Sequence, residues 1–299
     1  MDNSHFTLSD FLGYVIPGAS VLVVMLMFYH YPDEDYTSVD DLLRVVKKYS
    51  YLLIDKSAKV GVILPSFFVI LSYVAGHILA YLSSITVERF AIWVYGYPSE
   101  YLFSKVGWSH LFEDVNRVRK KRPRCWVLKS FMYLLIRIII IVVLFPLSSA
   151  VFFIKAISID GFLVKNLDPF LRDVIAKKLT SLRAQLNLPN DKDYKGADLH
   201  RIVHEYSYCK YDCIRQKMDN YVAIYDLMRS LTLIMVFVSW MLAYANIKYI
   251  KFLAPINWGT LFMIGIVLML TLLCFMAFMK FYRRYTLESY ICIASDKDL

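Results

Sequence analysis

The sequence lacks the short motifs that mark the common enzyme families. It contains no Gly-x-Ser-x-Gly nucleophile elbow, no His-Glu-x-x-His zinc motif, no Gly-x-x-x-x-Gly-Lys-Ser/Thr phosphate loop and no Gly-x-Gly-x-x-Gly dinucleotide loop. It also lacks an internal repeat, which argues against an inverted-repeat transporter. We therefore expect that the protein is not an enzyme and needs no cofactor.

Cysteine is too scarce and too irregularly placed to hold the fold together. The five cysteines are an odd number and form no disulfide framework. His200, His204, Cys209 and Cys213 have spacings that could suit zinc. On one continuous helix, however, the histidine pair and the cysteine pair would lie about 180° apart, so a break near residues 205–208 or a second protomer would be needed. We expect no metal site.

Charge is absent from five long stretches of the chain. These stretches lie between Asp10 and Asp33, Lys59 and Glu88, Arg137 and Lys155, Arg229 and Lys248, and Lys251 and Lys280. Hydrophobic residues make up 58% of the sequence and the mean hydropathy is +0.48, whereas globular proteins contain about 45–50% apolar residues. Each stretch approaches the length of a membrane-spanning helix. The sequence thus predicts an all-α, polytopic membrane protein with five apolar segments, which stays anchored because the first lacks the features of a removable signal peptide.

The third apolar segment has two possible paths. The distribution of Lys and Arg favours four firm crossings with the N-terminus inside, in which the third segment enters the membrane and returns at a break near Pro146. The continuous apolar run over residues 138–154 also fits a fifth crossing. The basic residues that flank the short third and fourth stretches are predicted to reach toward lipid headgroups. They are Arg137, Lys155, Arg229 and Lys248.

Changes in composition divide the chain into five parts. They are an N-terminal two-span unit (1–96), a basic connection (97–130), the third apolar segment (131–155), a polar helical region (156–228) and a C-terminal helical hairpin with its tail (229–299). The polar region contains an amphipathic helix with Asp168 as N-cap and Pro169 at its first position. Its apolar side could lie on a membrane or a partner helix.

A second helix in the polar region is expected to be very long. No Gly or Pro occurs between Gly196 and Pro255, so residues from about 198 to 246 are predicted to form one rod that continues into the fourth span. Such a rod would project well beyond the bilayer.

Cations are concentrated in the basic connection. Six of them fall within eight positions: Arg117, Arg119, Lys120, Lys121, Arg122 and Arg124. In a polytopic protein such a cluster sets topology and contacts anionic lipid or a partner. The net charge of +9 has the same explanation, and we expect no nucleic acid.

The second apolar segment carries a line of polar residues, which we call the polar stripe. Wound at about 100° per residue, its members fall within roughly 80° of one another over about 33 Å, close to the thickness of a bilayer. They are Ser66, Tyr73, His77, Tyr81, Ser84 and Glu88. Lipid does not solvate such a face, so it is predicted to look into a helix bundle or toward water. Packing against another helix, a water-filled pathway or an enzyme pocket would each supply hydrogen-bonding partners for this face.

Part of this segment resembles a group of known proteins. The residues are Gly76-His77 through Ser84, Glu88-Arg89 and Gly96-Tyr97-Pro98-Ser99-Glu100, together with Pro17-Gly18 in the first span. They resemble uncharacterised prokaryotic polytopic membrane proteins, some of which look like membrane components of anti-phage defence systems. The resemblance implies a bacterial inner-membrane protein whose action is loss of membrane integrity, and it supplies no catalytic residue.

Three functions fit these observations. The first is a multi-pass effector of the bacterial inner membrane, pore-like or membrane-perturbing, that forms a homo-oligomer and works with a cytoplasmic protein partner. The second is a membrane-embedded enzyme for lipid or isoprenoid substrates, and the third is a structural anchor for a soluble complex. A pore needs the polar stripe to line an axis, whereas an enzyme needs it to close a pocket.

Overall fold

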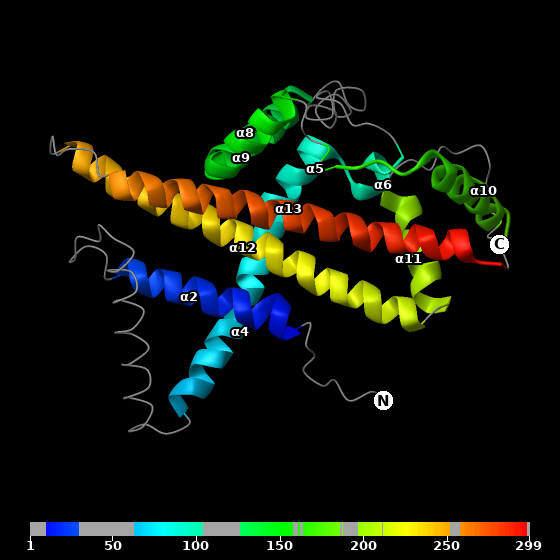
Figure 1. The fold of residues 1–299 in the computed structure, drawn as a ribbon, viewed down its shortest axis with the longest axis horizontal. Coiled ribbons are helices and arrows are strands. Elements are labelled where there is room, and N and C mark those ends of the chain that lie inside the picture. Colours follow the sequence, from blue (N-terminus) through cyan, green and yellow to red (C-terminus); the bar gives the residue numbers. More distant parts are fainter. Residues whose placement is uncertain are drawn as a thin grey trace. The chain divides into compact units, whose positions relative to one another are not determined.

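The described part of the chain is almost entirely helical. The structure, a computed structural model, describes residues 10–29, 63–103, 126–157, 161, 164–185, 187, 197–210, 212–251 and 258–297, and no strand occurs within these ranges (Figure 1). The helices are η1 (Phe11–Val15), α2 (Ile16–Tyr29), α4 (Ile63–Ser83), η3 (Ser84–Glu88), α5 (Arg89–Tyr95), α6 (Pro98–Tyr101), α8 (Trp126–Val143), α9 (Phe145–Ala156), α10 (Pro169–Gln185), α11 (Ala197–Lys210), α12 (Asp212–Lys251) and α13 (Trp258–Ser295).

The chain divides into two compact units, each assembled from separate pieces of sequence. The first unit comprises Met1–Val87, Leu144–Val151 and Asp226–Phe275. The second comprises Glu88–Val143, Phe152–Tyr225 and Met276–Leu299. Each unit is described by itself below.

Three helices are long and apolar enough to cross a membrane, and they indicate a membrane protein. They are Pro65–Tyr101 with 37 residues, Ile214–Tyr244 with 31 and Leu261–Ser295 with 35. The predicted count of five apolar segments, four of them firm crossings, is not confirmed. The first segment is a shorter apolar helix, Phe11–Leu26, and the third is a bent pair of helices that would raise the number of spans to four.

The third apolar segment is broken where Pro146 led us to expect a break. Helices α8 and α9 meet at an angle of 97° on either side of Leu144. Pro146 is the second residue of α9, where its missing N–H costs no helical hydrogen bond. The carbonyl oxygen of Leu144 accepts hydrogen bonds from the amides of Leu147 and Ser148, which closes the turn. Such a bend suits a broken span or a re-entrant segment.

In the first unit, two glycines let η1 and α2 cross α4 at very short range. A Cβ atom added to Gly76 would lie 1.9 Å from the carbonyl oxygen of Tyr14. One added to Gly18 would lie 1.7 Å from the carbonyl oxygen of Ser72. Both distances are far below contact, so any larger residue would force the two backbones apart. Close crossing over small residues is typical of helix packing in membranes.

The long rod predicted over residues 198–246 is wrong, because the chain turns between α11 and α12. On a continuous helix, Tyr208 and Asp219 would be about 16 Å apart along the axis. Instead the Tyr208 hydroxyl donates a hydrogen bond to Asp219 Oδ1 at 3.2 Å, and the Arg215 guanidinium lies 5.0 Å from the Tyr208 ring centroid. These contacts within the second unit fold the end of α11 back on the start of α12.

Helix α10 begins as predicted and packs differently from the prediction. Asp168 Oδ2 accepts a hydrogen bond from the amide of Phe170, and Pro169 is the first helical residue. Ile175 and Leu182 are fully buried within the second unit. Phe170, in the first turn of the same helix, is 75% exposed. The apolar side of α10 is therefore largely covered by its own chain.

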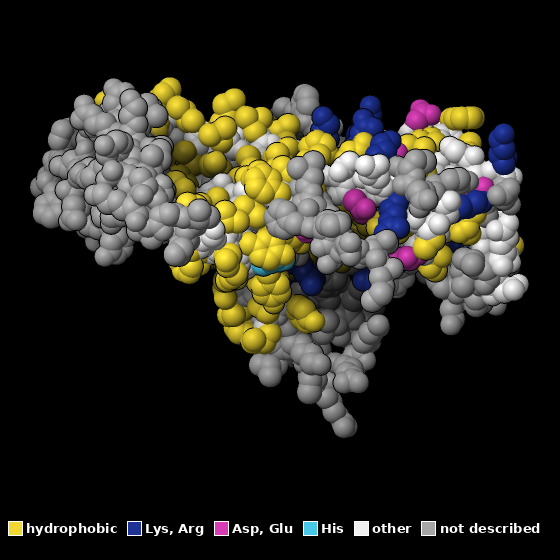
Figure 2. Space-filling view, turned by 90° about the horizontal axis from the view of Figure 1, so that it is seen from below, with side chains coloured by type: hydrophobic (Ala, Val, Ile, Leu, Met, Phe, Trp, Pro, Cys, Tyr) yellow, Lys and Arg dark blue, Asp and Glu magenta, His cyan; other side chains and the backbone are white. Residues whose placement is uncertain are grey.

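Apolar side chains remain exposed along the candidate spans. Phe67 and Ile70 on α4 are 61% and 62% exposed, and Phe262 and Met269 on α13 are 70% and 64% exposed. Hydrophobic side chains accordingly cover much of the described surface seen in Figure 2. Exposed apolar surface on this scale suits contact with lipid.

Candidate functional site

The polar stripe lies mainly on the exposed surface of α4. Ser66, Tyr73, His77 and Tyr81 are exposed, Tyr81 by 68%, and Ser84 is half-buried. Ile70 lies on the same face at about 100° per residue and separates Ser66 from the others. The continuous part of the stripe in the first unit therefore runs from Tyr73 to Ser84.

A π-helical turn ends this line of residues. Helix η3 spans Ser84–Glu88, and a π-turn contains one residue more than an α-turn. The step of 100° per residue does not hold through it, so Glu88 is rotated away from the line by up to about one residue's turn. Glu88 is half-buried in the second unit. The sequence pattern alone contained no sign of the π-turn.

Aromatic contacts connect the stripe to the first helix. The Tyr14 ring stacks on the imidazole of His77 with centroids 3.9 Å apart and an interplanar angle of 19°. The Tyr73 ring meets the same imidazole edge-on at 4.5 Å. Tyr14 belongs to η1, which lies against α4. These contacts fix one side of the His77 ring while His77 stays exposed.

The same unit contains a buried ion pair between two residues of α12, and its arginine is hydrogen-bonded to α4. Arg229 Nη2 is 2.7 Å from Asp226 Oδ1, and the two side chains are only 8% and 17% exposed. Arg229 Nε donates to Ser83 Oγ at 3.1 Å, and Nη2 donates to the carbonyl oxygen of Ala80 at 3.4 Å. The Ser83 hydroxyl is 3.4 Å from that of Ser230. Asp226 and Arg229 also act electrostatically on Tyr14.

We call this group the α4/α12 polar cluster: Ala80, Ser83, Asp226, Arg229 and Ser230. Its two charges compensate each other, and Arg229 is hydrogen-bonded to α4. The arrangement joins two candidate spans through polar contacts in a low-dielectric setting, where such bonds are costly to lose. Sequence reasoning missed the cluster, although the i, i+3 spacing of Asp226 and Arg229 is a recognisable signal for an ion pair on a helix.

The basic residues at the ends of the apolar stretches do not reach outward. Arg229 is 7% exposed, Arg137 4% and Lys155 6%. In the second unit the Arg137 guanidinium lies 4.9 Å from the Trp93 ring centroid, and Lys155 Nζ donates to the carbonyl oxygen of Val94 at 2.5 Å. The prediction that these side chains extend to headgroups is therefore wrong, because they are buried against aromatic rings and carbonyl groups of neighbouring helices. The side chain of Lys248 lies outside the described residues.

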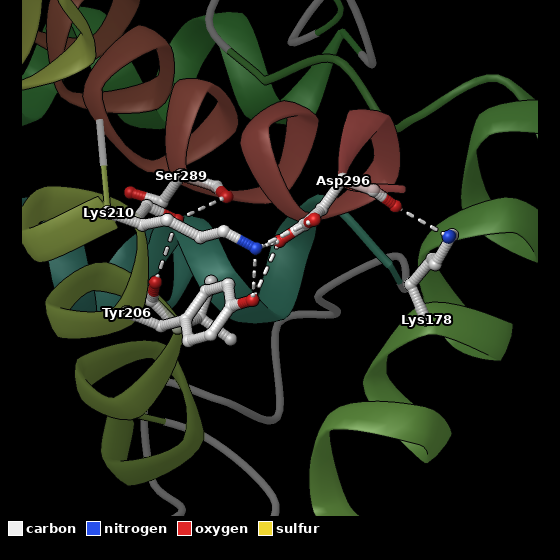
Figure 3. Close-up of polar contacts among 7 residues, drawn as sticks. Lys178, Tyr206, Lys210, Ser289 and Asp296 are labelled. Atoms are coloured by element: carbon white, nitrogen blue, oxygen red, sulfur yellow. Dashed lines mark hydrogen bonds and ion pairs between the residues drawn. The ribbon is translucent and has the colours of Figure 1, made fainter. Parts of the chain in front are cut away.

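In the second unit, one aspartate holds the end of α13. Lys210 Nζ lies 2.9 Å and 2.7 Å from the two carboxylate oxygens of Asp296, and the Tyr206 hydroxyl donates to Oδ2 at 2.7 Å. Lys178 of α10 donates to the backbone carbonyl of Asp296 at 2.7 Å. Ser207 Oγ donates to the carbonyl oxygen of Ser289 at 3.0 Å. Figure 3 shows Tyr206 and Lys210 at the Asp296 carboxylate and Lys178 at its backbone carbonyl on the other side.

Two histidines of α11 lie against tyrosines of α13. Burial lowers the pKa of His200 to about 4, with a smaller contribution from the charge of His204. Burial also lowers the pKa of His204. The His200 ring packs against Tyr285 and Tyr290, with centroids 6.1 Å and 5.9 Å away. Both imidazoles are therefore held in the neutral form at neutral pH.

No group of three or more metal-ligating side chains occurs among the residues that the structure describes. Cys209 is exposed, and the side chain of Cys213 lies outside the described residues. The predicted lipid-contact cluster, Arg117 to Arg124, also lies outside them.

The fold and its clusters define an α-helical protein with apolar helices long enough to span a membrane and a second, more polar helical unit. Comparison with known protein families, with curated proteins and with solved structures found no match to this chain.

Proposed function

We propose that the protein is a multi-pass membrane effector of the bacterial inner membrane that makes the bilayer leaky as a homo-oligomer, possessing no enzyme activity. In this proposal the polar stripe of α4 lines a hydrated pathway between copies. A cytoplasmic protein partner controls it, and anti-phage defence is the setting that the resemblance of residues 76–100 implies.

The exposed polar stripe is the observation that carries this proposal. The described residues leave Tyr81 68% exposed, and His77 keeps an exposed side although Tyr14 covers the other. If α4 lies in a bilayer, lipid does not solvate these groups. Another copy of the chain, or water enclosed by several copies, would satisfy them. Hydroxyl and imidazole groups can both donate and accept hydrogen bonds, so the same stripe can pair with itself.

A flux assay on the purified protein tests the proposal. The protein is reconstituted into vesicles that contain anionic lipid and trap a small fluorescent dye, and release is followed for wild type, His77→Leu and Tyr81→Phe. We expect wild-type release, and a loss of at least about tenfold in His77→Leu, because the wall loses its hydration. Leu82→Ile is the matched control, since Leu82 is 42% exposed and lies on another face of α4.

Cross-linking tests the oligomer separately. In a variant without native cysteines, Tyr81→Cys should form disulfide-linked dimers on oxidation in membranes, and Leu82→Cys should not. Dye release that is equal in wild type and His77→Leu, together with equal cross-linking at both positions, would contradict a pathway along the stripe.

The alternative of a structural anchor is favoured by one observation, the extensive polar contacts of α10 and α11 with the end of α13. An anchor would show no release from vesicles and would retain a soluble partner in the membrane. The membrane-embedded enzyme alternative requires a closed pocket around the stripe, and the exposure of Tyr81 disfavours it.

A further inference from the structure

The contacts at Asp296 concentrate the attachment of two helices on a single residue. Its carboxylate is 1% exposed and is bonded by Lys210 and Tyr206 of α11, while its backbone carbonyl is bonded by Lys178 of α10. Removal of the Asp296 carboxylate would leave the Lys210 ammonium and the Tyr206 hydroxyl without their shared hydrogen-bond acceptor. This fastening, made by Lys178, Tyr206, Lys210 and Asp296, is expected to weaken when the Asp296 carboxylate is lost, since Lys210 and Tyr206 share that carboxylate as their acceptor.

Another ion pair described in the second unit, between Lys217 and Glu288, has a different character. Lys217 Nζ is 2.8 Å from Glu288 Oε2 and joins α12 to α13, with side chains 51% and 11% exposed. A pair with one partner half in solvent contributes less to stability than a pair buried on both sides. It therefore serves as a matched control, because it also ends on α13 but does not involve α10 or α11.

Lys210 is the accessible member of the fastening. Its side chain is 29% exposed, in contrast to that of Asp296. It is also hydrogen-bonded to the Tyr206 hydroxyl at 3.0 Å, and burial and the Asp296 bond raise the pKa of Tyr206, which keeps this hydroxyl protonated. An anionic group arriving from solvent can reach Lys210 without first unfolding α13.

We propose that Lys178, Tyr206, Lys210 and Asp296 form a latch that holds α10 and α11 against the C-terminal end of α13 and restrains the leak activity until it is released. This inference rests on the proposed function, because it assigns the regulation of that activity. Helix α13 is a single helix of 38 residues that contains the candidate span Leu261–Ser295. Restraint at its end therefore acts on the helix that carries the span.

Two measurements on the full-length protein in vesicles test the latch. Hydrogen exchange reports opening of α11, and dye release reports activity. Asp296→Asn should speed exchange in α11 by at least about tenfold, because a buried ion pair is lost, and should raise dye release severalfold above wild type. Glu288→Gln should leave both unchanged.

A reversible staple separates release of the latch from other effects of the substitution. In a variant without native cysteines, Ser207→Cys and Ser289→Cys are placed where the Ser207 hydroxyl of α11 meets the Ser289 carbonyl oxygen of α13 at 3.0 Å. In combination with Asp296→Asn, oxidation should return dye release to the wild-type level, and reduction should raise it again. This outcome would show that detachment of α11 is what increases release.

The possible failures are distinguishable. Faster exchange in Asp296→Asn with unchanged, measurable dye release would overturn the latch as a regulator and leave the proposed function standing. Unchanged exchange in α11 would overturn the latch itself. No release from wild type, Asp296→Asn or the reduced staple would overturn both the regulation and the proposed function.

Discussion

The buried ion pair between Asp226 and Arg229 makes an asymmetric prediction about stability. Arg229 remains charged when its partner is removed, because a guanidinium does not lose its proton in proteins. An isolated carboxyl group can instead become protonated and neutral. We therefore expect Asp226→Leu to be more destabilising than Arg229→Met, although each removes the same ion pair.

The burial of this pair and its hydrogen bonds determine how much each substitution should destabilise the protein. With side-chain exposures of 8% and 17%, the pair is buried, and removal of one partner of a buried pair costs about 3–5 kcal/mol. Asp226→Leu should fall in this range. Arg229→Met gives up hydrogen bonds to Ser83 and Ala80 but leaves no fixed charge, so about 1–3 kcal/mol is expected. The double variant should cost less than Asp226→Leu alone, since no uncompensated charge remains.

Thermal unfolding of the purified protein in detergent, followed by fluorescence-detected gel filtration, measures the order of the three variants. The ion pair between Lys217 and Glu288 is the control. Lys217→Met should shift the thermal midpoint little, because Lys217 is half in solvent. Equal losses for Asp226→Leu and Arg229→Met, or a double variant whose loss is the sum of the two, would refute the reasoning.

Two further predictions concern the helix crossing and the α11 histidines. Gly76→Ala should lower stability by several kcal/mol and disrupt the α2/α4 contact, because its Cβ would lie 1.9 Å from a backbone oxygen, whereas Gly13→Ala, with no atom within 4 Å, should be tolerated; equal thermal midpoints for the two would contradict the crossing. Because burial lowers the pKa of His200 to about 4, the unfolded chain binds the extra proton first as pH falls below about 6.5, so stability should decline by up to about 3 kcal/mol between pH 6.5 and 4 and then level off. His200→Phe should flatten this decline in unfolding measurements across that range, and an unchanged slope would exclude His200 as its source.

Local signals in the sequence predicted some parts of this fold well. The Asp168-Pro169 pair places the start of α10, because an aspartate cap and a proline at the first position act through neighbouring backbone groups alone. The break beside Pro146 follows from the same kind of local chemistry. Long charge-free stretches likewise identify the helices Pro65–Tyr101 and Leu261–Ser295 as candidate spans.

Other features could not be predicted because distant residues create them. The turn between α11 and α12 contains neither Gly nor Pro, and it is accompanied by contacts from Tyr208 to Asp219 and from Lys210 to Asp296. Helix propensity does not reveal these contacts, because it describes the preference of each residue for a helix and not contacts between residues far apart in the sequence. The π-turn η3 shifts Glu88 for a similar reason, because a uniform step of 100° assumes an unbroken α-helix.

The basic residues beside the apolar stretches show how this difference affects functional interpretation. A cation at the end of a hydrophobic run has two ways to avoid lipid, by extending to the headgroups or by finding partners on another helix. The first fixes the depth of a helix in the bilayer, and the second fixes its register against a neighbour. Arg229 takes the second course with Asp226 and Ser83, and Lys155 does so with the Val94 carbonyl. Substitution of these residues should therefore alter helix–helix contacts before it alters topology. They belong to the structural framework of the proposed effector, and the exposed stripe of α4 is the surface to be tested for conduction.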